Sequence, residues 1–148
     1  MTLEVIAQFA TALSVVIAVV TVLLGIRVYR RQMNAQLFVE YTGRYEQIMG
    51  SFPRDNWQAR LTMEDYLPDP SDELSLCVLK YLNLCSEEFY LHKKKYLADD
   101  VWNIWEAEIN RTLATPLFVR EWSKLRPEFE SYPEFQIFVE QAAKPLDS

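Results

Sequence analysis

Apolar residues fill the start of this chain without interruption and then recur further on at helical spacing. From Val5 to Ile26 the sequence runs for 22 residues without a charged side chain. As an α-helix this stretch would be about 33 Å long, because a helix rises about 1.5 Å per residue. The hydrocarbon core of a bilayer is about 30 Å thick. The pattern therefore predicts a transmembrane helix near the N-terminus.

Small residues recur along this stretch at intervals of four and three, so they share one face of the helix. Lipid gives helices no hydrophobic reason to associate, and small side chains allow their backbones to approach closely. The pattern thus predicts a transmembrane packing face, and the partner is either another membrane protein or a copy of this chain. The positions are Ala7, Thr11, Ser14, Ala18, Thr21 and Gly25.

Two alternatives to a packing face remain open. The Ser and Thr hydroxyls of this stripe can bond to their own helix backbone and need no partner. The stripe could instead line the pore of a homo-oligomeric channel, because three of its residues, Thr11, Ser14 and Thr21, offer hydroxyl groups.

The charges that flank the apolar stretch favour one orientation. Arg27, Arg30 and Arg31 follow it, whereas Glu4 is the only charged side chain before it. A secretory signal would carry positive charge ahead of its apolar region, so we expect an uncleaved anchor. By the positive-inside rule the arginine end is cytoplasmic, and the three arginines lie at headgroup depth. We expect a single-pass protein of the cytoplasmic (inner) membrane with its N-terminus outside.

The rest of the chain is predicted to be helical. The membrane helix should continue to Gly50, where Gly50-Ser51-Phe52-Pro53 is a stop signal. Apolar spacing and capping residues then predict a short helix over 57–64 and a long helix from the Ser71 cap to about residue 96. They also predict helices after Asp99 or Asp100, from Thr115-Pro116 to Pro127, and from about Pro133. The predicted fold is all-α: residues 1–31 form the anchor and basic segment, and residues 32–148 form a cytoplasmic helical bundle.

Apolar side chains within these helices indicate a packed core. Trp102 and Trp105 belong to the core or, alternatively, to a partner surface. The long central helix presents one apolar stripe, made of Leu74, Val78, Tyr81, Cys85 and Phe89.

Charge and cysteine spacing argue against nucleic-acid binding and against a disulfide. From Tyr45 onward there are 11 basic and 19 acidic residues, a net charge of −8, which argues against nucleic-acid binding. Cys77 and Cys85 would be about 12 Å apart on one helix, too far for a disulfide. They are expected to be packed thiols in a reducing compartment.

Candidate chemistry is sparse. His92 is the single histidine, and one histidine with two distant cysteines cannot supply a zinc site. The pairs Glu87-Glu88 and Glu106/Glu108 are interpreted as solvated carboxylates. Phosphate-cradling loops and nucleophile motifs are missing, so we expect neither a catalytic residue, a metal nor a cofactor, and do not expect an enzyme.

Four groups of residues between Phe89 and Phe138 form a further pattern: Tyr90 to Leu97, Asp100 to Trp105, Pro116-Leu117 with Trp122, and Tyr132 to Phe135. This pattern resembles a group of uncharacterised bacterial membrane-anchored helical proteins, a domain-of-unknown-function group. The resemblance implies an N-terminal span with a helical cytoplasmic domain, and it implies no activity.

Together these patterns predict a protein whose work is association. We expect an accessory or scaffolding subunit that contacts the lipid bilayer and other membrane helices, or copies of itself. The homo-oligomeric channel is the alternative.

Overall fold

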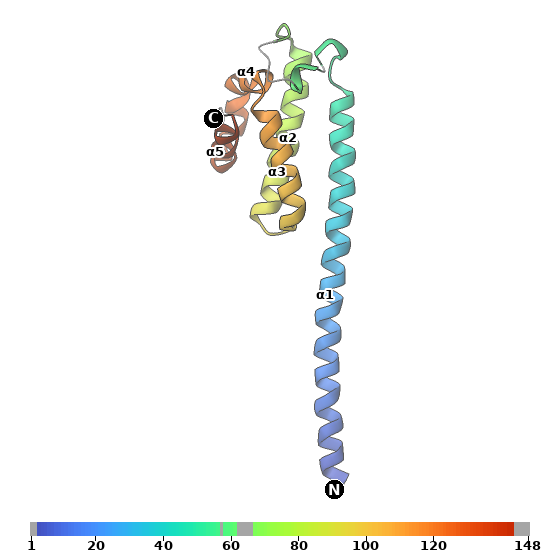
Figure 1. The fold of residues 1–148 in the computed structure, drawn as a ribbon. Coiled ribbons are helices and arrows are strands. Elements are labelled where there is room, and N and C mark those ends of the chain that lie inside the picture. Colours follow the sequence, from blue (N-terminus) through green and yellow to red (C-terminus); the bar gives the residue numbers. More distant parts are fainter. Residues whose placement is uncertain (1–2, 57, 62–66, 144–148) are drawn as a thin grey trace. The chain divides into compact units, whose positions relative to one another are not determined.

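Every regular element among the described residues is a helix, which confirms the predicted all-α class (Figure 1). The structure, a computed structural model, describes residues 3–56, 58–61 and 67–143. Its α-helices are α1 (Leu3–Gly50), α2 (Asp72–Lys93), α3 (Asp99–Leu113), α4 (Pro116–Leu125) and α5 (Pro133–Ala142). Short 3-10 helices are η1 (Arg54–Asn56), η2 (Gln58–Arg60) and η3 (Arg126–Phe129).

The chain divides into two compact units. The first extends to Leu37 and the second begins at Phe38. In the first unit every side chain from Ala7 to Gln32 is exposed, so this part of α1 has no core of its own. The predicted division after residue 31 concerns membrane placement rather than packing, and it stays a prediction.

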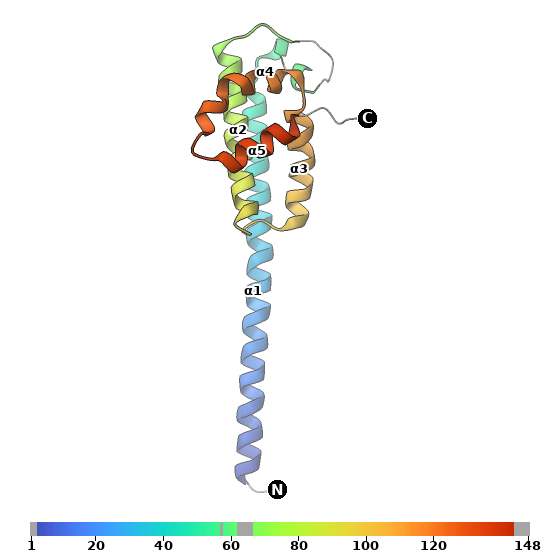
Figure 2. The ribbon, with the colours of Figure 1, turned by 90° about the vertical axis from the view of Figure 1, so that its left-hand side faces the viewer.

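The second unit holds the hydrophobic core. Helices α2 and α3 run in opposite directions (Figure 1), and α5 lies across both of them (Figure 2). Phe89 of α2 meets Trp102 of α3 and Phe135 of α5, with ring centroids 6.1 and 6.0 Å apart. The fully buried apolar side chains include Leu74, Val78, Leu113, Leu117, Phe118 and Phe135.

Local signals set several helix boundaries where the sequence predicts them. Helix α1 ends at Gly50. The Ser71 hydroxyl accepts a hydrogen bond from the Leu74 amide at 3.2 Å, which caps α2. Proline occupies the first turn of α4 and of α5, where its missing N–H costs no helical bond.

The C-terminus of α2 corrects one prediction, since the helix ends at Lys93 and not near Tyr96. The Tyr96 amide bonds to the Leu91 carbonyl and the Lys95 amide to the His92 carbonyl, both at 2.9 Å. This is a Schellman motif, which usually places glycine in the left-handed conformation. Here Lys95 occupies that position with φ 60°, so the sequence carries no glycine to mark the end.

Two further predictions differ from the structure. The N-cap of α3 is Ala98, so Asp99 and Asp100 lie in the first helical turn, where their charge suits the helix dipole. Within the predicted helix over 57–64, the described residues form only the single turn of η2. Trp57 and residues 62–64 lie outside the described residues.

A buried carboxylate ties α4 to α2 and to the preceding loop. Glu121 has no exposed surface and accepts hydrogen bonds from Ser75 at 2.6 Å and from Arg120 at 2.9 Å. Arg120 also donates to the Pro68 carbonyl at 2.5 Å. Burial alone would raise the pKa of Glu121. The hydrogen bonds from Ser75 and Arg120 lower it by more, so the pKa is below its ordinary value.

Candidate functional site

The first candidate site is the apolar part of α1, which carries the predicted packing face. All six of its residues, Ala7, Thr11, Ser14, Ala18, Thr21 and Gly25, lie on this one helix and are exposed. A methyl group added at Gly25 would meet nothing within 4 Å. Packing inside the described chain therefore does not require these small side chains.

The three hydroxyls of the stripe bond within their own helix. Thr11 donates to the Ala7 carbonyl at 2.9 Å, Ser14 to Ala10 at 2.7 Å, and Thr21 to Ile17 at 2.8 Å. A hydroxyl donor satisfied in this way can face lipid without the cost of an unmade hydrogen bond. The stripe can thus lie against lipid or against a smooth protein surface.

The arginines after the apolar stretch are free to meet charged groups outside the chain. Arg27, Arg30 and Arg31 are all exposed on α1. Among the residues that the structure describes, no carboxylate forms an ion pair with them.

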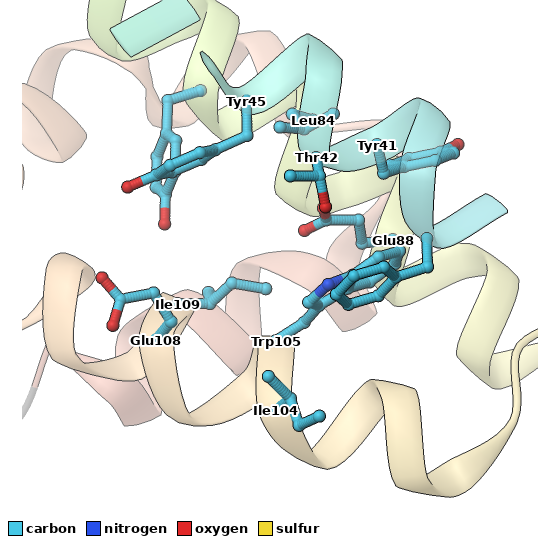
Figure 3. A pocket seen from close by; sticks show the side chains of 11 residues that line it. Tyr41, Thr42, Tyr45, Leu84, Glu88, Ile104, Trp105, Glu108 and Ile109 are labelled. Atoms are coloured by element: carbon cyan, nitrogen blue, oxygen red, sulfur yellow. The ribbon is translucent and has the colours of Figure 1, made fainter. Parts of the chain in front are cut away.

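A cavity of about 200 Å³ forms the second candidate site, and it lies within the unit that begins at Phe38 (Figure 3). Three helices contribute to its wall. The lining residues are Phe38, Tyr41, Thr42 and Tyr45 from α1, Tyr81, Leu84 and Glu88 from α2, and Ile104, Trp105, Glu108 and Ile109 from α3. Phe38 and Ile104 are exposed, so solvent reaches this cavity past apolar side chains.

Aromatic rings form two sides of the cavity. Trp105 stacks on Phe38 with centroids 6.0 Å apart and lies 5.5 Å from Tyr41. Tyr45 meets Tyr81 edge to face at 6.2 Å. The residue types at helical spacing predicted a core here, and the structure leaves Trp105 only half-buried along the wall of the cavity.

Glu88 lines this largely apolar site, and its burial corrects the expectation that it is a solvated carboxylate. The residue is 6% exposed. Burial raises its pKa to about 8, with Glu87 adding to the rise and Arg44 opposing it. No hydrogen bond or ion pair to its carboxylate exists among the described residues, so at pH 7 the acid is mostly neutral.

The neighbouring Glu87 has a different environment. Arg44 donates to its carboxylate from both terminal guanidinium nitrogens, at 2.5 and 3.0 Å, and the Tyr41 hydroxyl donates to it at 3.2 Å. The hydrogen bonds from Arg44 lower the pKa of Glu87 despite its partial burial. Two adjacent glutamates therefore differ in charge near neutral pH, because Glu88 is buried whereas hydrogen bonds from Arg44 stabilise the ionised form of Glu87.

The histidine and the two cysteines that the sequence offers as candidates are packed among other side chains of the bundle. The His92 ring stacks on Trp102 with centroids 4.6 Å apart, and its Nδ1 lies 3.8 Å from the Asp99 carboxylate. Cys77 and Cys85 are buried free thiols, as predicted. Within the described ranges, no group of three or more His, Cys, Asp or Glu side chains has the arrangement of a metal site.

Sequence reasoning missed the cavity, although one signal for it is present. Two residues of the apolar stripe of α2, Tyr81 and Cys85, are continued at helical spacing by Glu88 and then by His92. The steps are four, three and four residues. Glu88 occupies a core-facing position of this helical repeat. A glutamate is usually solvated, but the position of Glu88 in the helical repeat indicates burial. The structure shows that Glu88 is buried.

Comparisons with protein-family models, with curated proteins and with solved structures find no match to this chain. The resemblance to membrane-anchored helical proteins stays a prediction. One α-helix near the N-terminus is long and apolar enough to cross a membrane, judged by length and composition.

Proposed function

We propose that this chain is a single-pass membrane protein that works by association and not by catalysis. Its span docks against other membrane helices, and its aromatic-rich acidic bundle lies in the cytoplasm. The protein is then an accessory or scaffolding subunit of a larger membrane complex, or the protomer of a homo-oligomer. The N-terminal end of the span faces outward, because Arg27, Arg30 and Arg31 stay on the cytoplasmic side.

The observation that carries this proposal is the continuous apolar surface of α1. Large apolar side chains such as Phe9, Leu13, Val16 and Leu23 are each more than half exposed. A contiguous exposed apolar surface marks a membrane or protein contact. Lipid covers such a surface along the apolar part of α1, and the small-residue face leaves one side where a second helix can approach.

The packing face does not depend on hydrogen bonds between helices. Each stripe hydroxyl already donates to a carbonyl of its own helix and keeps only its acceptor lone pairs for other groups. Close backbone approach needs only small side chains, which all six positions supply.

Cysteine cross-linking in native membranes tests the proposal. Single cysteines are placed at Thr11, Ser14, Ala18 or Thr21 in a chain whose native cysteines are replaced by alanine. Matched controls at Phe9, Val16 and Leu23 lie on the opposite side of the helix. We expect cross-links from the stripe positions, to a second copy or to another membrane protein, and far fewer from the controls.

Equal cross-linking around the helix, or none from the stripe, would overturn the packing face. Ion flux through the purified protein in liposomes that is blocked by leucine at Ser14 or Ala18 would favour the channel instead.

A further inference from the structure

The cavity lined by α1, α2 and α3 has no role in the association proposed above. It lies in the unit that begins at Phe38, and it combines an apolar wall with one buried acid (Figure 3). Pockets of this kind, mostly apolar with a few converging polar groups, are where proteins bind small molecules.

The aromatic wall is suited to a cation. Phe38, Tyr41 and Trp105 form one contiguous group of rings, while Tyr45 and Tyr81 form another. The face of an aromatic ring carries partial negative charge and attracts a cation within about 6 Å of its centre. Tyr41 already uses this property, because the Arg44 guanidinium lies 5.0 Å from its ring centre.

The buried acid lacks the partner that such a cation would provide. Glu88 lines the cavity and is 94% buried, by its exposed fraction of 6%. No described residue donates a hydrogen bond to its carboxylate. Its oxygens are not among the fully buried side-chain atoms that lack a partner, so they keep contact with the space of the cavity. An ionised carboxylate in such a place is normally found beside a positive charge.

The surrounding charges select against an anion. Glu88 and Glu108 are the charged residues of the lining, and both are acidic. The nearby arginines are already paired: Arg44 with Glu87 and Arg111 with Glu108. An anionic ligand would therefore meet two acidic side chains and no free cation in the described wall.

We propose that this cavity binds a small organic cation, an alkylammonium or quaternary ammonium group held between the aromatic rings and the carboxylate of Glu88.

The volume sets the size of the group. A cavity of about 150 Å³ in another protein holds benzene, and this one is about 200 Å³. A trimethylammonium group with a short alkyl arm fits that space. The same cation occurs in free metabolites and in phosphocholine lipid headgroups, and the phosphate distinguishes the two sources.

Calorimetric titration of the full-length chain in a maltoside detergent provides the test. Choline is compared with 3,3-dimethylbutan-1-ol, which has the same shape and no charge. We expect choline to bind at least tenfold more tightly than the neutral alcohol. Glu88→Gln should weaken choline at least tenfold and leave the alcohol unchanged, whereas the control Glu106→Gln, outside the lining, should alter neither.

A pH series provides a readout that a merely structural role of Glu88 would not produce. Choline keeps its charge at every pH, so any pH dependence belongs to the protein. Its affinity should rise from pH 6 to 8 by up to tenfold per unit and level off above the pKa of Glu88, about 8. Titratable or charged groups near Glu88 are Tyr41 and Arg44 on α1, Tyr81, Cys85, Glu87 and His92 on α2, and Glu108 on α3.

Three results would overturn the proposal. They are equal binding of choline and the alcohol, no binding of either, and full choline affinity in a folded Glu88→Gln variant. A glycerophosphocholine titration identifies the source: affinity equal to choline indicates a lipid headgroup, and weaker binding indicates a free metabolite, because the phosphate is repelled.

Discussion

Replacing Glu88 with glutamine should change how the stability of the helical bundle depends on pH. Glutamine has the shape of a protonated glutamic acid and carries no charge at any pH. In the native chain, burial favours the protonated form of Glu88, and its pKa rises from 4.5 to about 8 on folding. Folding thus takes up a proton between these two pH values.

The sign and size of the effect follow from that shift. The folded pKa lies above the unfolded one for an acid, so stability is highest below pH 4.5. It falls as pH rises toward 8 and is level above that. At about 1.4 kcal/mol per pKa unit, Glu88 alone should lower the free energy of unfolding by about 3–4 kcal/mol between pH 5 and pH 8. The lowered pKa values of Glu87 and Glu121 act below this window.

Guanidinium denaturation followed by tryptophan fluorescence measures the effect. All four tryptophans lie after Phe38, so the signal reports the bundle and not the apolar part of α1. Between pH 5 and pH 8, we expect the unfolding free energy of the wild type to fall by about 3–4 kcal/mol more than that of Glu88→Gln. The exposed control Glu130→Gln should follow the wild type. Identical pH profiles for the wild type and Glu88→Gln would refute the reasoning.

Three further predictions concern other parts of the chain. Lys95→Gly should stabilise the bundle by about 1 kcal/mol in the same denaturation assay, because glycine adopts φ 60° without strain; Lys94→Gly, at an ordinary φ, should not stabilise it. Glu121→Ala should lower the unfolding free energy by about 2–3 kcal/mol, because the hydroxyl of Ser75 and the guanidinium of Arg120 lose their acceptor; an unchanged midpoint would contradict the network. The full chain should stay in the membrane pellet after an alkaline carbonate wash, and full release of the wild type would contradict the anchor. Val16→Arg should make the free energy of membrane insertion less favourable by about 3 kcal/mol.

Local signals made much of the fold predictable from sequence. The ends of helices depend on nearby residues, so Gly50, Ser71 and the prolines at 116 and 133 marked boundaries that the structure confirms. The apolar stripe of α2 was predictable for the same reason, because helical spacing alone determines which side chains share a face.

Features that depend on tertiary contacts could not be predicted in this way. The left-handed Lys95 ends α2 without a glycine, so residue type gave no signal. The buried Glu121 is stabilised by Ser75, which is 46 residues away. The cavity requires side chains from three helices, and the burial of Glu88 depends on how α1 and α3 pack against α2.

Native mass measurement after mild detergent extraction tests the central claim most directly. One chain has a mass of 17.4 kDa. The proposed association predicts a particle that is a multiple of this mass or contains a second membrane protein, and leucine at Ser14 and Ala18 should dissociate it. A solitary 17.4 kDa chain, or an assembly unaffected by those leucines, would contradict the claim that the small-residue face of α1 contacts protein.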